Sequence, residues 1–126
     1  MTANSICVGF GLKFLLLLRP HRLNPIGLHL REWLVRLLAC NDLTTKTVSS
    51  WVIHLGGPRI LSAVEEALPL TADNMAPSRG VLRHYGNMSS PTVLFVTERL
   101  RRDGAKLPLV ILGFGPGLIV EAALVR

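Results

Sequence analysis

The sequence predicts an α/β domain whose sheet is largely buried. Short, very apolar runs alternate along the chain with longer segments whose apolar residues recur every three or four positions. The first pattern is typical of strands buried on both faces, the second of amphipathic helices, and their alternation indicates an α/β fold. The 126 residues suffice for one domain. Several of the roughly four predicted strands are too apolar to face water, so we expect further protein to pack against the sheet.

The first predicted elements are a strand, a helix and a second strand. Residues 11–18 form an apolar run bounded by Gly and Arg-Pro, which predicts a buried strand. This run is too short to cross a membrane and lacks the basic start and cleavage site of a signal peptide. Residues 26–39 have a helical period, and residues 51–53 read as the next strand. The expected buried stripe of the helix is Leu30, Trp33, Leu34, Leu37 and Leu38.

A second helix is predicted to begin at Pro58, because proline is favoured at the first helical position. Pro69 ends it. Residues 71–80 contain Pro77 and are expected to form a loop, and residues 81–85 read as a last helical turn or a strand end. The residues that this second helix is expected to bury are Ile60, Leu61, Val64 and Leu68.

The last third of the sequence predicts a helix followed by two strands. Ser89 or Ser90 is expected to cap this third helix, and Gly104 to close it. A Glu98–Arg102 ion pair is expected on its surface. The predicted elements that follow are a strand over 107–112, a turn over 113–117 and a final strand over 118–125. The expected inner face of the helix comprises Val93, Leu94, Thr97 and Leu100.

The chain is basic, with 14 Lys and Arg against 8 Asp and Glu. Such a surface suits nucleic acid, an anionic membrane or a phosphorylated cofactor, and it equally suits a solvated face with no specific partner. We expect no nucleic acid as a partner, because no basic-aromatic platform is present, and no membrane, because the early apolar run is too short to span one. Cys7 and Cys40 form no CxxC pair and read as small apolar residues of a reducing, cytoplasmic compartment, not as nucleophiles.

Two junctions place a polar side chain between an apolar segment and a helix. His54 follows the strand at 51–53 and precedes two glycines, and Asn87 precedes a Ser-Ser-Pro helix start. Side chains at the carboxyl ends of strands in α/β sheets point into a crevice. A lone histidine here can equally be a hydrogen-bonded structural residue, and a lone asparagine a turn residue. Together they predict a polar site with two donors.

Other motifs favour structural readings. The run 113–117, Gly-Phe-Gly-Pro-Gly, lacks the lysine of a phosphate loop and leads into a strand, so we interpret it as a tight turn that brings backbone close to a ligand or loop. His21, His29 and His84 are isolated and show no metal-ligand spacing. No metal site is predicted.

Three motifs in this order resemble the C-terminal half of a type III polyketide synthase, the chalcone and stilbene synthase family. They are Trp-Val-Ile-His-Leu-Gly-Gly-Pro-Arg-Ile-Leu at 51–61, Arg-Gly-Val-Leu-Arg-His-Tyr-Gly-Asn-Met-Ser-Ser-Pro at 79–91 and Gly-Phe-Gly-Pro-Gly-Leu at 113–118. The resemblance extends over residues 11–126 and implies one domain with half of a thiolase-like fold, a mixed sheet packed with helices. Residues 1–10 match nothing recognisable and are left unassigned.

The resemblance implies an acyltransferase that extends an acyl-CoA starter with malonyl-CoA by decarboxylative condensation, with CoA thioesters as substrates and no cofactor. In that family a Cys, a His and an Asn share the work, and His54 and Asn87 match the last two. Two donors in a dry pocket would stabilise the enolate, and the imidazole would hold the cysteine as thiolate. Implied substrate contacts are Gly56 and the backbone of Arg59 along the pantetheine arm, Ser89 beside the pocket, and Gly113, Phe114, Gly115, Pro116 and Gly117 in the cavity wall.

The sequence departs from the family at several points. The nucleophilic cysteine belongs to an N-terminal half, and neither Cys7 nor Cys40 lies in a matching motif, so we expect this chain to be inactive alone and to form a homodimer only when joined to that half. Leu55 stands where the family has proline, which affects the stiffness of the loop. The alternatives are an initiating ketoacyl-carrier-protein synthase, which uses the same three residue types, and a non-catalytic remnant or structural half that completes a separate N-terminal partner.

Overall fold

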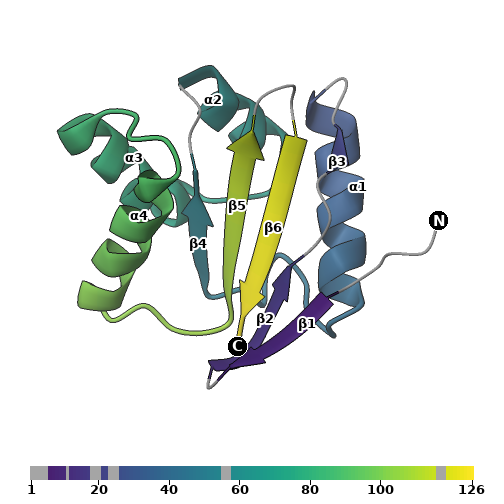
Figure 1. The fold of residues 1–126 in the computed structure, drawn as a ribbon. Coiled ribbons are helices and arrows are strands. Elements are labelled where there is room, and N and C mark those ends of the chain that lie inside the picture. The colour runs from purple at the N-terminus through teal and green to yellow at the C-terminus, as the bar shows by residue number, and fades with distance from the viewer. Residues whose placement is uncertain (1–5, 11, 18–20, 23–25, 55–57, 116–118) are drawn as a thin grey trace.

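The computed structural model describes residues 6–10, 12–17, 21–22, 26–54, 58–115 and 119–126. These form a mixed six-stranded sheet with two helices on each face (Figure 1). The strands are β1 (Ile6–Phe10), β2 (Leu12–Leu17), β3 (His21–Arg22), β4 (Ser50–Ile53), β5 (Leu109–Gly115) and β6 (Ile119–Val125). The helices are α1 (Ile26–Ala39), α2 (Pro58–Ala67), α3 (Ala72–Tyr85) and α4 (Pro91–Arg102).

The sheet has the strand order β1-β2-β6-β5-β4, and β3 also pairs with β6. Only β4 and β5 run parallel among the described pairs. Strands β2 and β3 lie along the same edge of β6, with Leu16 opposite Leu124 and His21 opposite Val120. The parallel pair matters most for function, because two parallel strands bring their carboxyl ends to one edge of the sheet.

Alternate side chains of β4, β5 and β6 face the two helical layers. Trp51 and Ile53 of β4 belong to the core beneath α1 and α2, whereas Val52 belongs to the core beneath α3 and α4. This is the period-2 alternation of a pleated strand that is covered on both sides. All four residues of β4 are buried. The prediction of an α/β domain with a buried sheet is confirmed.

Helices α1 and α2 agree with the prediction. Their bounds match residues 26–39 and the predicted start at Pro58. All five residues of the predicted α1 stripe contribute to the core, Trp33 only partly. The core that these helices form with the sheet includes Leu30, Leu34, Leu38, Leu61, Val64 and Leu68.

Residues 71–80 form most of helix α3, so the predicted loop is wrong. Thr71 and Asn74 make a capping box, in which the Thr71 hydroxyl accepts from the Asn74 N–H and the Asn74 side chain accepts from the Thr71 N–H. Pro77 sits inside the helix, where its ring removes one backbone donor. Burial of Met75, Ser78 and Val81 compensates for that loss.

Helix α4 begins and ends near the predicted positions, and of its predicted inner face Leu100 is buried and Val93 packs against the same core. Leu94 was expected inside and is 70% exposed, while Thr92 and Val96 are buried. The predicted serine cap is also wrong, since the backbone of Ser90 is helical and its side chain makes no capping bond. Gly104 does close the helix, with φ of 71°, as predicted.

The strands are more numerous than predicted. Residues 6–10, left unassigned from sequence, form β1, and His21–Arg22 form the short β3. Gly113, Phe114 and Gly115 extend strand β5 and pair with β6, so they are not part of a turn. Glycine weakens the sequence signal of a strand, although it fits where backbone must lie close to another group.

Candidate functional site

His54 is held at the carboxyl end of β4. Its N–H donates to the Leu112 carbonyl at 2.8 Å, which continues the β4–β5 ladder by one residue. By the alternation that places Val52 under α3 and α4, the His54 side chain belongs to the same face. Its Nε2 atom is buried and has no hydrogen-bond partner among the described residues. A buried polar atom without a partner is rare in a folded protein and is a candidate for ligand contact.

Asn87 lies in the connection between α3 and α4, and its side chain is oriented by the local backbone. Its Oδ1 accepts from the Ser89 N–H at 2.9 Å. Because a backbone N–H can only donate, the accepting atom must be the carboxamide oxygen. The Nδ2 amide is therefore the part of Asn87 that is left to donate to a ligand.

The Asn87 connection has an unusual backbone on both sides. Gly86 has φ of 71°, and Ser89 has φ of 60°, which is uncommon for a residue with a Cβ atom. The Met88 N–H donates to Thr92 Oγ1 at 3.2 Å, and Thr92 is fully buried at the start of α4. Residues with a Cβ atom that are held in this left-handed region occur often at functional sites. The backbone of the exposed Ser89 therefore sets the shape of the loop around Asn87.

Gly113 lies beside His54 on the neighbouring strand. Ile53 is in register with Leu112, so the next position on β5 is Gly113, on the same face as Ile111. A Cβ built on Gly113 meets no atom within 4 Å. The described residues thus leave open space next to the histidine.

The other predicted wall and arm residues are placed differently. Phe114 is only 8% exposed and packs in the core under α1 and α2, on the sheet face opposite to Gly113, and Gly115 is exposed. Arg59 lies in the first turn of α2, with its side chain outside the described part of the chain. Gly56, Pro116 and Gly117 also lie outside the described residues.

The fold brings His54, Gly113 and the Asn87 connection to one end of the sheet. In Figure 1 the chain enters α4 at the end where β4 and β5 terminate. The two described cysteines are elsewhere. Cys7 lies on β1, four strands from β4 or roughly 19 Å at the usual strand spacing, and Cys40 is exposed just after α1.

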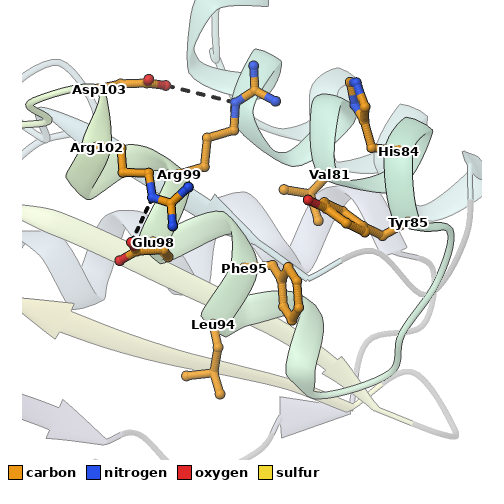
Figure 2. A pocket seen from close by; sticks show the side chains of 9 residues that line it. All are labelled: Val81, His84, Tyr85, Leu94, Phe95, Glu98, Arg99, Arg102 and Asp103. Carbon is orange, nitrogen blue, oxygen red and sulfur yellow. Dashed lines mark hydrogen bonds and ion pairs between the residues drawn. The ribbon is translucent and has the colours of Figure 1, made fainter.

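A groove between α3 and α4 escaped prediction from the sequence. It has a volume of about 610 Å³ and carries Tyr85, Leu94 and Phe95, which are 60%, 70% and 42% exposed (Figure 2). The rings of Tyr85 and Phe95 lie 5.1 Å apart. The sequence held one signal for this groove, because the helical period placed Leu94 on the apolar face of its helix. An apolar face of this kind implies that something covers it.

Charged side chains rim the groove. The Glu98 carboxylate accepts hydrogen bonds from Arg101 at 2.7 Å and Arg102 at 2.8 Å, as the predicted i,i+4 pair required. These two guanidinium groups lower the pKa of Glu98 to about 2. Arg99 lies 3.8 Å from Asp103. Its guanidinium also covers Gly80, where an added Cβ would lie 2.7 Å from a guanidinium nitrogen and would displace the end of the arginine side chain.

No group of three metal-ligating side chains occurs among the described residues. No helix within those residues is long and apolar enough to cross a membrane.

Comparison with known proteins agrees with the motifs. Residues 29–126 match the family described as chalcone and stilbene synthases, C-terminal domain. The chain is also similar to the crystal structure of PKS-I from the brown alga Ectocarpus siliculosus, with 30% identity and a TM-score of 0.72. That similarity covers 78% of this chain and 28% of PKS-I, so the chain spans about a quarter of the algal protein.

Proposed function

This chain belongs to the chalcone and stilbene synthase family, and we propose that it supplies the histidine and the asparagine of a polyketide condensation site. The observation that carries the proposal is the buried Nε2 of His54, which has no partner within the part of the chain that the structure describes. The Asn87 carboxamide adds a second donor, because its oxygen accepts from the Ser89 N–H and its Nδ2 makes no hydrogen bond within the described ranges.

The two donors fit the charge that develops when malonyl-CoA loses CO₂. Cleavage of the bond to the carboxylate leaves its electron pair on the α-carbon and the thioester oxygen, as an enolate. The N–H groups at His54 Nε2 and Asn87 Nδ2 would donate to that oxygen. Asn87 is exposed in this chain, so the dry site in which such donors are worth several kcal/mol requires a further half that covers it. The enolate carbon then attacks an acyl thioester, forms a carbon–carbon bond and expels the thiolate.

We assign the acyl-carrying thiolate to a cysteine of the family's N-terminal half. Cys7 lies on β1, four strands from β4, and Cys40 is exposed just after α1, so we propose neither as the nucleophile. Malonyl-CoA and an acyl-CoA starter are the proposed substrates, and the proposed contacts are Gly56, Arg59, Ser89, Gly113, Gly115, Pro116 and Gly117. Phe114 is not among them, because it packs in the core on the opposite face of the sheet. Gly113 has the most direct support, because it borders open space beside His54.

The α3–α4 groove supports the expectation of a further protein half. Tyr85, Leu94 and Phe95 expose an apolar face next to the Asn87 connection, and so large an exposed face is typical of an interaction surface (Figure 2). We propose that the cysteine-bearing half covers it and so completes the site.

Mixing experiments test the proposal. This chain would be combined with the part of PKS-I that it does not match, prepared as a separate polypeptide, and incubated with malonyl-CoA and an acyl-CoA starter. We expect a condensation product from the mixture and none from either part alone. A stable complex without condensation would instead support a structural half. The absence of both a complex and a product would support a non-catalytic remnant.

A further inference from the structure

Ser78 is a buried polar residue that the motifs do not explain. It lies in the middle of α3, and its side chain is fully buried. Its Oγ accepts a hydrogen bond from the Ile53 N–H at 3.1 Å. Ile53 is the last residue of β4 and the neighbour of His54.

This bond falls on the unpaired edge of the strand. The N–H groups of Ser50 and His54 point to β5, where they donate to Pro108 and Leu112. The Ile53 N–H therefore points the other way, and β4 is the last strand in the described sheet order. Since Ile53 is fully buried, that N–H would cost free energy if it had no partner. Ser78 supplies the partner.

The same helix leads directly to the second donor. From Ser78, α3 runs without interruption to Tyr85 and continues through Gly86 into Asn87. Seven residues of helix span about 10 Å. This second half of α3 is thus attached to β4 beside His54 at its start, and Asn87 follows its end. Two donors must meet one oxygen within a fraction of an ångström to stabilise it.

We propose that Ser78 is a positioning residue, which fixes α3 to the end of β4 and so sets the placement of His54 relative to Asn87. This inference rests on the proposed function. Ser78 touches no reacting atom, and it acts through the Ile53 backbone and the second half of helix α3.

The test compares Ser78→Ala with Ser50→Ala in the complemented synthase. Ser50 is a matched control, since it is also buried and its Oγ donates to the Lys106 carbonyl at 3.0 Å, at the opposite end of the same strand. We expect Ser78→Ala to lower kcat for malonyl-CoA decarboxylation by about 10- to 100-fold with little change in KM. Ser50→Ala should leave kcat near wild type, and Ser78→Thr, which keeps the hydroxyl, should restore it.

A second readout uses this chain alone and needs no activity. Ser78→Ala should shift the NMR signals of the His54 ring and speed exchange of the Ile53 amide, and Ser50→Ala should change neither. The inference is overturned if Ser78→Ala and Ser50→Ala give the same kcat, or if the His54 signals do not move. A complemented wild-type synthase without decarboxylation would contradict the proposed function instead, and the NMR comparison would still decide the role of Ser78.

Discussion

At the scale of single residues, the site depends on which atoms are left without a partner. His54 Nε2 is buried and unpaired among the residues that the structure describes, while the oxygen of Asn87 accepts from the Ser89 N–H. Both residues could be selected from sequence, because each ends a segment just before a turn and a helix. Ser78 could not, since its contact with Ile53 joins positions 25 apart and exists only in the fold.

Gly113 gives a prediction at this scale. Its φ lies outside the left-handed region and a Cβ there meets nothing, so Gly113→Ala should leave the free energy of unfolding unchanged or raise it by about 0.4–1 kcal/mol. The added methyl would nonetheless occupy the space beside His54 and lower condensation by the complemented synthase.

Gly104→Ala is the matched control for this comparison. Gly104 has φ of 71°, so alanine there should lower the free energy of unfolding by about 1 kcal/mol or more. Urea unfolding followed by tryptophan fluorescence at one protein concentration measures both variants, because Trp51 is buried in the core. A marked loss of stability in Gly113→Ala would contradict the open space assigned here.

At the scale of elements, helices with an uninterrupted apolar period were predictable and the others were not. The stripe of α1 is regular, and its bounds follow from it. Helix α3 carries Pro77 and only three buried residues, so local signals favoured a loop and tertiary packing decided otherwise. The glycines at the end of β5 favoured a turn over a strand in the same way. Pairing with β6 outweighs their low β-strand propensity.

The capping box of α3 can be tested against the start of α4. Thr71→Ala removes the acceptor for the Asn74 N–H and should lower the free energy of unfolding by about 1 kcal/mol. Ser90→Ala should have almost no effect, because Ser90 makes no capping bond. Equal losses in the two variants, measured by urea unfolding, would show that the capping bond is not what stabilises α3.

The ion pairs of α4 predict a pH dependence. The pKa of Glu98 is about 2 in the folded chain against an ordinary 4.5. The stabilisation that the Glu98 carboxylate gives to the folded chain is therefore complete above pH 4.5 and is lost as the pH falls towards 2. The unfolding midpoints of wild type and Glu98→Gln should therefore converge over that window. The difference should be small and should shrink in high salt, because the carboxylate is exposed. A difference between the two unfolding midpoints that stays constant from pH 5 to pH 2 would contradict a stabilising role for the Glu98 ion pairs.

At the scale of the whole molecule, the sequence predicted the fold class but not the arrangement of the strands. The order of the six described strands depends on long-range pairing, and no local pattern encodes it. The expectation that further protein packs against the sheet stays a prediction, because α1 to α4 cover both faces of β4, β5 and β6. Exposed apolar side chains gather instead in the α3–α4 groove (Figure 2).

This surface predicts that the chain associates with itself when it is isolated. Replacing Leu94 and Phe95 by glutamine should shift sedimentation towards the monomer, because both side chains are exposed on the groove. Val35→Gln is the matched control, since Val35 is 48% exposed on the other helical layer and lies outside the groove. A wild-type chain that is monomeric and melts cooperatively would contradict the prediction.

The central claim is that His54 and Asn87 together stabilise an enolate. Its most direct test is the rate of CO₂ release from malonyl-CoA by the complemented synthase, measured for wild type, His54→Ala and Asn87→Ala. We predict a loss of about 100-fold or more in each variant, as for removal of one oxyanion donor. Unchanged CO₂ release in both variants would remove the two residues from the site.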